Sequence, residues 1–270
     1  MNWVKSIIVG IVFIAIFYVM NWQSATGAIA GNLNHIWSLA IEEQFYIIWS
    51  LLLFTAFVRS LSRKQIAAGT AFIVAGLIIQ RAIRAANGAS IEVLYYSTDT
   101  RIDAILIGCL ASMTFCWRLV PSAFFKTPAF GRLTAGAAIV AISILMTFDH
   151  EDTLLYLGFI SLYSLSVSIV MLWLVTRDKT AVHKLFENSV LRWLGRISYG
   201  LYLWHFVFFE FAKNQFDDVS DRVFVGVFSA LFVASVSFYL VESPILKLKD
   251  VWSANKGLKR AELTSNGQPA

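Results

Sequence analysis

Apolar residues occur in long runs that are separated by short polar segments. The runs lie approximately at Ser6–Met20, Gln44–Val58, Ile66–Ile83, Ile102–Trp117, Leu133–Phe148, Leu154–Val175, Leu194–Phe211 and Val223–Val241. Most of them approach the about 17–20 residues that an α-helix needs to cross the hydrocarbon layer of a membrane. The pattern therefore predicts an all-α fold, a polytopic transmembrane helical bundle of about eight spans.

The composition favours a membrane protein over a soluble one. Hydrophobic residues make up 58% of the 270 residues and charged residues 14%, whereas soluble domains average about 25% charged residues. The net charge of +5 is distributed over short loops, so we expect membrane lipid as a partner and no nucleic acid. Small residues follow the first run at Ser24 to Ala28, so this run could be a secretory signal peptide. Asn21-Trp22-Gln23 favours the alternative, in which the run is a helix that ends at the membrane interface.

The positions of lysine and arginine predict the orientation. If the N-terminus is cytoplasmic and the spans alternate, most of the 22 Lys and Arg residues fall in cytoplasmic segments, as the positive-inside rule requires. Both termini are then cytoplasmic. We expect one transmembrane domain over residues 1–250 and a polar, mostly disordered cytoplasmic tail over residues 251–270. Few basic residues remain at the outer side: Arg81, Arg84, Arg101, Lys213 and Arg222.

Other polar groups have plainer interpretations. Asp149-His150-Glu151-Asp152 reads as a solvated outer loop. Cys109 and Cys116 are seven residues apart in one helix, which separates them by about 10 Å, too far for a disulfide. No His/Cys cluster has the spacing of a zinc site, so no metal is expected.

One polar stretch runs directly into an apolar helix, and spanning a membrane does not require its residues. It extends from His35 to Tyr46 and contains two adjacent carboxylates, Glu42 and Glu43. If a helix begins near Leu39, then Glu42, Phe45, Tyr46 and Trp49 share one face. The glutamates could simply complement the helix dipole. Alternatively, His35 and Glu42 form an acid/base pair.

A second polar stretch, Tyr95 to Asp103, enters the helix predicted at Ile102–Trp117. Arg101 and Asp103 lie close to hydrocarbon, where an unpaired charge is costly, so they could pair with each other. Alternatively, Arg101 binds an anionic or carbonyl group of a ligand, and Arg81 and Arg84 join it.

Two further motifs lie near the end of the chain. Ser198, Tyr202 and His205 share a helix face, where a histidine is either a hydrogen-bonded structural residue or a functional one. Pro244 is expected to end the last helix, with Glu242 in a structural role. We find no P-loop, GxSxG, GxGxxG, HExxH or EF-hand pattern.

Taken in order, these stretches resemble the acyltransferase family 3 membrane proteins. The family pattern His-x-Trp-Ser-Leu-x-x-Glu-x-Gln-Phe-Tyr is similar to His35–Tyr46, and Thr-x-x-Arg-x-Asp-x-x-x-x-Gly is similar to Thr98–Gly108. Ser-Tyr-x-x-Tyr-Leu-x-His resembles Ser198–His205, and Glu-x-Pro resembles Glu242–Pro244. The first motif is the most specific, and the similarity extends over nearly the whole chain.

The resemblance implies a multi-pass O-acyltransferase of the bacterial inner membrane. It would move an acyl group, often acetyl, from acyl-CoA to a hydroxyl of a carbohydrate or lipid-linked glycan, with acyl-CoA as a substrate and no tightly bound cofactor. Such a reaction needs a base for the hydroxyl and donors for the carbonyl oxygen. We expect catalytic roles for His35, Glu42 and Ser38, and substrate-binding roles for Trp37, Gln44, Tyr46, Arg101, Asp103, Ser198, Tyr199 and His205.

One feature departs from the family pattern. Members usually begin with two or three further spans, the first of which carries a histidine regarded as the acyl-transfer centre. No residue here matches it, so we expect a fragment, a misassigned start or a divergent member. Two other classes stay open: a transporter or flippase of a polar substrate, which should show internal repeats, and a non-catalytic membrane partner.

Overall fold

The structure is a computed structural model that describes residues 19–26, 35–177 and 180–248. These residues form helices joined by short loops, and no strand occurs among them. The chain divides into two compact units, Met1–His183 and Lys184–Ala270. The predicted tail and the first apolar run, apart from the last two residues of that run, lie outside the described residues.

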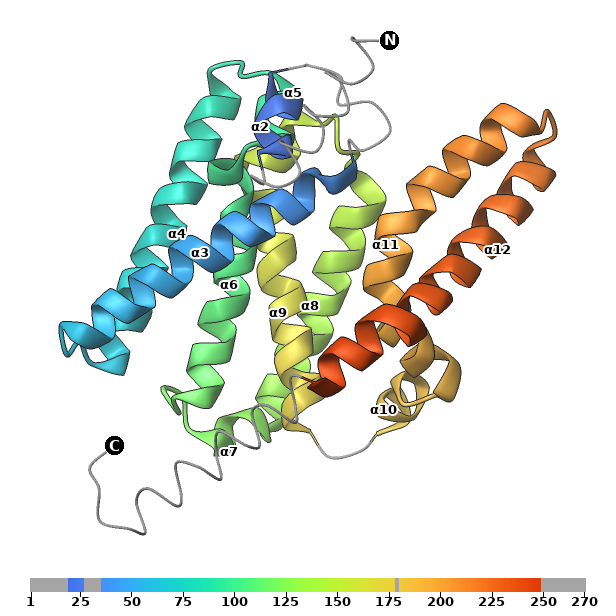
Figure 1. Cartoon of the computed structure of the whole chain (residues 1–270). Helices are drawn as coiled ribbons and strands as arrows, with labels where there is room; N and C mark the ends of the chain where they lie inside the picture. The colour runs from blue at the N-terminus through green and yellow to red at the C-terminus, as the bar shows by residue number, and fades with distance from the viewer. Residues whose placement is uncertain (1–18, 27–34, 178–179, 249–270) are drawn as a thin grey trace, which may run out of the picture. The chain divides into compact units, whose positions relative to one another are not determined.

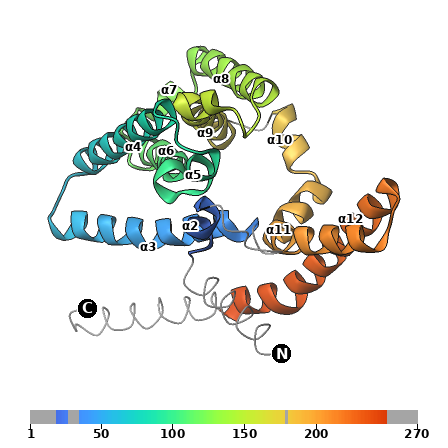
Figure 2. The ribbon, with the colours of Figure 1, turned by 90° about the horizontal axis from the view of Figure 1, so that it is seen from above.

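The first unit contains four helices that stand side by side, crossed at a slant by a fifth (Figure 1). The four are α4 (Arg63–Ala86), α6 (Thr98–Cys116), α8 (Pro128–Thr147) and α9 (Ile160–Thr176), and the fifth is α3 (Trp37–Val58). The short helices α2 (Met20–Ala25) and α5 (Ile91–Tyr96) pack together where α3 and α6 begin, as the view from above shows (Figure 2). The remaining elements are α7 (Ser122–Phe125) and a π-helical turn, η2 (Leu155–Phe159), that leads into α9.

The second unit is built on an antiparallel helical hairpin. Its arms are α11 (Ser189–Gln215) and α12 (Val219–Ser237), and a second π-helical turn, η3 (Phe238–Glu242), follows α12. The short helix α10 (Ala181–Phe186) lies at the boundary between the two units.

The helices confirm an all-α, multi-pass membrane protein. Each of the seven predicted apolar runs from Gln44 onward lies, to within one residue at either end, inside a helix or a helix joined to a π-turn. Among the described residues, five helices are long and apolar enough to cross a membrane: Trp37–Val58, Arg63–Ala86, Pro128–Thr147, Leu155–Thr176 and Val219–Leu248. The long helices α6 and α11 lie outside this set, and α6 begins with three charged residues, Asp99, Arg101 and Asp103.

Large apolar side chains cover much of the outer surface. Phe72 is 81% exposed, Met146 82% and Leu240 72%. Such exposure would be unfavourable in water over so wide an area, but it suits hydrocarbon. Inside the first unit, a cluster of buried apolar side chains consists of Phe45, Val74, Leu106 and Ile107.

Side-chain caps explain where several helices begin. Ser62 and Gln65 form a capping box at the start of α4, which satisfies two backbone N–H groups that have no partner within the helix. Thr127 caps α8 and is followed by Pro128 at the first helical position, where the missing proline N–H is harmless. Asn188 and Asp218 cap α11 and α12 in the same way.

The prediction that Pro244 ends the last helix is wrong. The helical span continues from Val219 to Leu248. The π-helical turn η3 immediately precedes the proline, and a π-turn changes the hydrogen-bond register locally. Pro244 therefore sits near the start of a new helical turn, where a proline is tolerated.

Candidate active site

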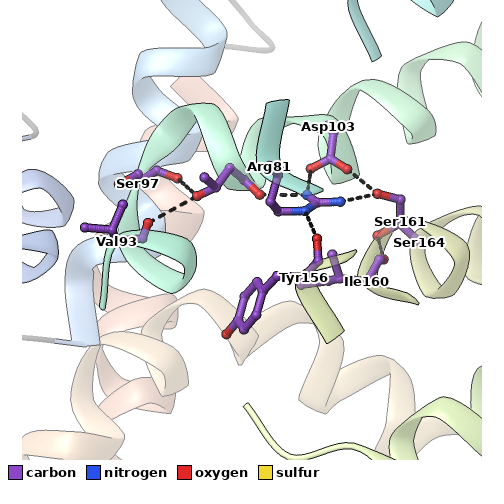
Figure 3. Close-up of polar contacts among 9 residues, drawn as sticks. Arg81, Val93, Ser97, Asp103, Tyr156, Ile160, Ser161 and Ser164 are labelled. Atoms are coloured by element: carbon purple, nitrogen blue, oxygen red, sulfur yellow. Dashed lines mark hydrogen bonds and ion pairs between the residues drawn. The ribbon is translucent and has the colours of Figure 1, made fainter. Parts of the chain in front are cut away.

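A fully buried arginine, Arg81 of α4, lies at the centre of a polar cluster in the first unit. Its Nη1 donates to Asp103 Oδ1 and to the Thr100 carbonyl, both at 2.7 Å. Its Nε donates to the Tyr156 carbonyl at 3.1 Å, and its Nη2 donates to Ser161 Oγ (Figure 3). The Ser161 hydroxyl donates in turn to Asp103 Oδ2 at 2.5 Å. This cluster joins α4, α6, η2 and α9 through bonds that engage every guanidinium nitrogen.

The open question about Asp103 is thereby answered. Its carboxylate pairs with Arg81, not with Arg101. Arg101 precedes Asp103 by two residues on the same helix, and residues at that spacing do not face each other. Asp103 is 1% exposed, and both of its oxygens accept bonds from within the cluster.

A second arginine is also matched to a carboxylate. Arg84 Nη2 lies 2.8 Å from Asp99 Oδ2, and Gln80 Nε2 donates to the same oxygen at 2.7 Å. This pair is partly exposed. Arg81 and Arg84 therefore do not join Arg101 in one anion site, as one sequence-based alternative supposed.

Arg101 has a different environment. Its guanidinium carbon lies 5.2 Å from the centre of the Tyr95 ring and 5.7 Å from that of Trp37, within the range of a cation–π interaction. Trp37 also contacts Tyr95 and Tyr96, with ring centres 4.9 and 5.2 Å apart. Among the described residues no carboxylate forms an ion pair with Arg101. Its guanidinium therefore lies against aromatic rings and is not paired with a carboxylate there.

Arg101 lines a cavity of about 390 Å³ in the first unit. The walls come from α5, α6, α8 and α9 and from the loop before η2. The lining residues that carry chemistry are Tyr95, Arg101, Asp103, His150, Tyr163 and Ser164. A partly apolar cavity with a few convergent polar groups is the usual form of a small-molecule site.

Sequence reasoning missed several of these residues. His150 was assigned to a solvated loop, and its side chain is indeed 57% exposed, but its ring also packs on Tyr95 with centres 5.7 Å apart. Tyr163 and Ser161 lie within an apolar run and were not singled out. The sequence does place a histidine next to a span that begins with tyrosines and serines. This pattern indicates a site only once it is known which helices face one another.

Gln44 of α3 belongs to a polar network with Asn21 of α2 and Thr98 of α6. Gln44 Nε2 donates to Asn21 Oδ1 at 2.9 Å, and Asn21 Nδ2 donates to Thr98 Oγ1 at 2.9 Å. The Thr98 hydroxyl donates back to Gln44 Oε1 at 2.5 Å. Asn21 is fully buried. The network ties α2, α3 and α6 together, which gives Gln44 a positioning role in the structure.

The other residues of the His35–Tyr46 stretch differ in how exposed they are along α3. His35 and Ser38 are half-buried at the start of the helix, whereas Glu42 and Tyr46 are exposed and Phe45 is buried. Glu42 forms no hydrogen bond or ion pair with any described residue, so the expected contact between His35 and Glu42 is not formed. Trp37 of this motif contacts the Arg101 guanidinium, whose carbon lies 5.7 Å from the centre of its ring.

The second unit holds a separate cavity of about 420 Å³ between α11 and α12. Ser198, Tyr202 and His205 line it, as the shared helix face predicted. His205 Nδ1 lies 2.6 Å from the Tyr202 carbonyl, so Nδ1 carries the proton in the neutral ring. Tyr199 is 51% exposed and does not line this cavity.

Across the described ranges, no three His, Cys, Asp or Glu side chains come together as a metal site. The geometry thus defines a multi-span helical membrane protein with a cavity of aromatic rings and one arginine. Residues 4–242 match the model of acyltransferase family 3, described as an acyltransferase domain. The match covers most of the chain, so the chain belongs to this family, which confirms the resemblance read from its motifs.

Similar proteins include named O-acetyltransferases. The chain is 29% identical over 249 residues to the peptidoglycan O-acetyltransferase OatA of Listeria monocytogenes, a match that covers 86% of this chain and 39% of that protein. It is 30% identical over 256 residues to a protein of Staphylococcus aureus (strain COL) whose O-acetyltransferase name is an inferred one, covering 86% and 40%. The chain spans about two fifths of the length of these relatives. No solved structure matches it.

Proposed function

We propose that this chain transfers an acyl group, acetyl in the first instance, from acyl-CoA to a hydroxyl of a carbohydrate or glycolipid. Family membership supports the acyltransferase chemistry. The name of the Listeria relative supports an acetyl donor and a peptidoglycan acceptor. The reaction converts a thioester and an alcohol into an ester and a thiol.

The observation that carries the proposal is the environment of Arg101. The two neighbouring arginines are paired with carboxylates, whereas Arg101 lies on aromatic faces at the wall of the cavity. Aromatic rings suit the apolar faces of a sugar, and a guanidinium suits a carbonyl or carboxylate oxygen. A muramic-acid type of acceptor offers both groups.

The membrane topology follows from the same proposal. We infer about eight spans with both termini cytoplasmic, in the bacterial inner membrane. The distribution of lysine and arginine supports this orientation. In that proposed orientation the Arg101 cavity would face the outer side, where glycans are assembled.

His35, Glu42 and Ser38 are proposed catalytic residues, and Tyr46 and Trp37 are proposed contacts for the acceptor. Ser198, Tyr199 and His205 would contact substrate from the second unit. Each role is tested by a separate substitution.

The test is direct transfer. The full chain is reconstituted in lipid nanodiscs with radiolabelled acetyl-CoA and a soluble muropeptide, and alkali-labile label on the muropeptide is counted. We expect ester formation that depends on both substrates. Uptake of the muropeptide into vesicles without acetyl-CoA would favour a transporter. Absence of label on the acceptor would contradict the proposal.

A further inference from the structure

Arg177 immediately follows α9 and lies against the first turn of α8, at the end of these helices where α7 is found (Figure 1). Its Nη2 donates to the carbonyl of Thr127, the N-cap residue of α8, at 2.8 Å. A Cβ atom at Gly131, one turn further along α8, would lie 3.6 Å from the same Nη2. The guanidinium is thus tethered to the start of α8 through one of its nitrogens.

The other donors of Arg177 have no partner among the described residues. Its Nε is buried without a hydrogen-bond partner, and its Nη1 makes no hydrogen bond to a described residue. A guanidinium is always charged, and a buried donor without a partner costs free energy. Asp178, the next residue in the sequence, lies outside the described residues. The tether to Thr127 therefore leaves a positive charge that no described carboxylate neutralises.

Further positive charge lies next to this arginine. Lys126 and Arg132 stand on either side of the first turn of α8 in the sequence, and both are exposed. The N-terminus of α8, a helix of 20 residues, adds a partial positive charge. The sequence contains no Asp or Glu between Asp103 and Asp149. The segment that carries Lys126 and Arg132 therefore supplies no carboxylate to balance them.

The site lies at the edge of the membrane-spanning part of the fold. Thr127 immediately precedes the candidate span Pro128–Thr147, and Arg177 immediately follows the candidate span Leu155–Thr176. Long basic side chains at such a position extend their charged groups toward water. In the proposed orientation this edge is the cytoplasmic one.

The donor set suits a phosphate group in particular. A planar guanidinium binds two phosphate oxygens at once, and the N-terminus of a helix favours the same anion. Lys126 and Arg132 add cations that can balance a group with more than one negative charge. A neutral ligand would leave these charges unmatched.

We infer that Arg177, with Lys126 and Arg132 beside it, binds a phosphate group at this membrane face. Two sources of phosphate reach such a face: coenzyme A, which is part of the proposed donor, and the headgroup of an anionic phospholipid. The interaction is electrostatic and forms no covalent bond. It does not depend on the proposed acetyl transfer.

The test measures binding to the full chain in maltoside detergent, which contains no phosphate. Coenzyme A is compared with pantetheine, the phosphate-free part of the same molecule, and phosphatidylglycerol is compared with diacylglycerol. A ligand that binds the folded chain raises the midpoint of thermal unfolding. We expect coenzyme A or phosphatidylglycerol to raise the midpoint in a saturable way, and the two phosphate-free compounds to leave it unchanged. The compound that acts identifies the source.

Substitutions locate the site. Arg177→Gln should weaken the binding about tenfold or more, because it removes hydrogen bonds to a charged group. Arg132→Gln should weaken it about fivefold through the lost charge alone, and this exposed position keeps the test decisive if Arg177→Gln does not fold. Arg63→Gln, the same change at the exposed start of α4, is the control and should bind normally.

Several results would overturn the inference. They are the absence of any shift with both phosphate compounds, an equal shift with their phosphate-free counterparts, and full affinity in both Arg177→Gln and Arg132→Gln. A further one is that Asp178→Asn, without ligand, lowers the midpoint as much as Arg177→Gln, since Asp178 would then be the counter-charge of Arg177. No acetyl transfer is measured, so a failure here leaves the proposed function standing, and a chain that transfers no acetyl can still bind phosphate.

Discussion

Arg81 and Asp103 form an ion pair in which Nη1 and Oδ1 lie 2.7 Å apart, and both side chains are almost completely buried. The pair is completed by Ser161, which bonds to both partners. Because charges in a membrane interior are costly unless matched, this trio fixes the relative positions of α4, α6 and α9. It thereby fixes the wall of the cavity that Arg101 and His150 line.

Removal of one partner should destabilise the first unit strongly. In Asp103→Asn the Arg81 guanidinium keeps its burial but loses its counter-charge, and breaking a buried pair in this way costs about 3–5 kcal/mol. Thermal unfolding in detergent would measure the loss. The double variant Arg81→Met/Asp103→Leu should be more stable than either single variant, and simple additivity of the two losses would contradict the account.

The network of Asn21, Gln44 and Thr98 should behave similarly on a smaller scale. Asn21→Ala leaves the Gln44 amide and the Thr98 hydroxyl without this partner, and an unsatisfied buried polar group costs about 1–3 kcal/mol. We expect a lower midpoint of thermal unfolding together with faster proteolysis near α2. Gln23→Ala on the same short helix serves as the control. Equal stability of the two variants would show that the network contributes nothing.

Gly226 of α12 packs against the Phe209 ring of α11 in the helical hairpin of the second unit. A Cβ atom at this position would lie 3.1 Å from the Phe209 ring, whereas one at Gly195 would meet nothing within 4 Å. Gly226→Ala should therefore destabilise the hairpin by about 1–3 kcal/mol through overpacking. Gly195→Ala, the matched control on α11, should be neutral or stabilising because alanine favours helix. The reverse order of stabilities would refute this packing.

A lysine at position 101 should not bind the muropeptide as well as Arg101 does. A guanidinium is planar and stacks on aromatic rings, whereas an ammonium group is a compact, strongly hydrated charge. Arg101→Lys should weaken muropeptide binding about tenfold in calorimetry, although the net charge is unchanged. Arg63→Lys, at the exposed start of α4, is the control and should bind normally. Full affinity in Arg101→Lys would mean that charge alone is recognised.

The apolar pattern of the sequence predicted where the helices lie along the chain. It did not predict which side of each helix faces its neighbours. The apolar runs located α4, α8 and α9 because membrane-spanning length is a local property of the chain. The partner of Asp103 could not be predicted in the same way. Arg101 is near it in sequence, but the rotation of α6 points Asp103 at Arg81.

Two other differences have local physical causes. The π-helical turn at Phe238–Glu242 has no distinctive composition, so Pro244 was expected to stop a helix that in fact continues. The loop at Asp149–Asp152 has the composition of a solvated segment, and most of its side chains are exposed. That prediction of an exposed loop is correct, but only the fold shows that His150 also packs against Tyr95 and lines the Arg101 cavity.

The central claim is that the cavity beside Arg101 is where the acyl group is transferred. The most direct test compares kcat/KM for acetyl transfer to a muropeptide by the unsubstituted chain, Arg101→Ala and the surface control Arg63→Ala. A hydrogen bond to a charged group is worth about 1.5–3 kcal/mol, so Arg101→Ala should lower kcat/KM by about 10- to 100-fold while Arg63→Ala leaves it unchanged. Equal kcat/KM values for all three proteins would contradict the claim.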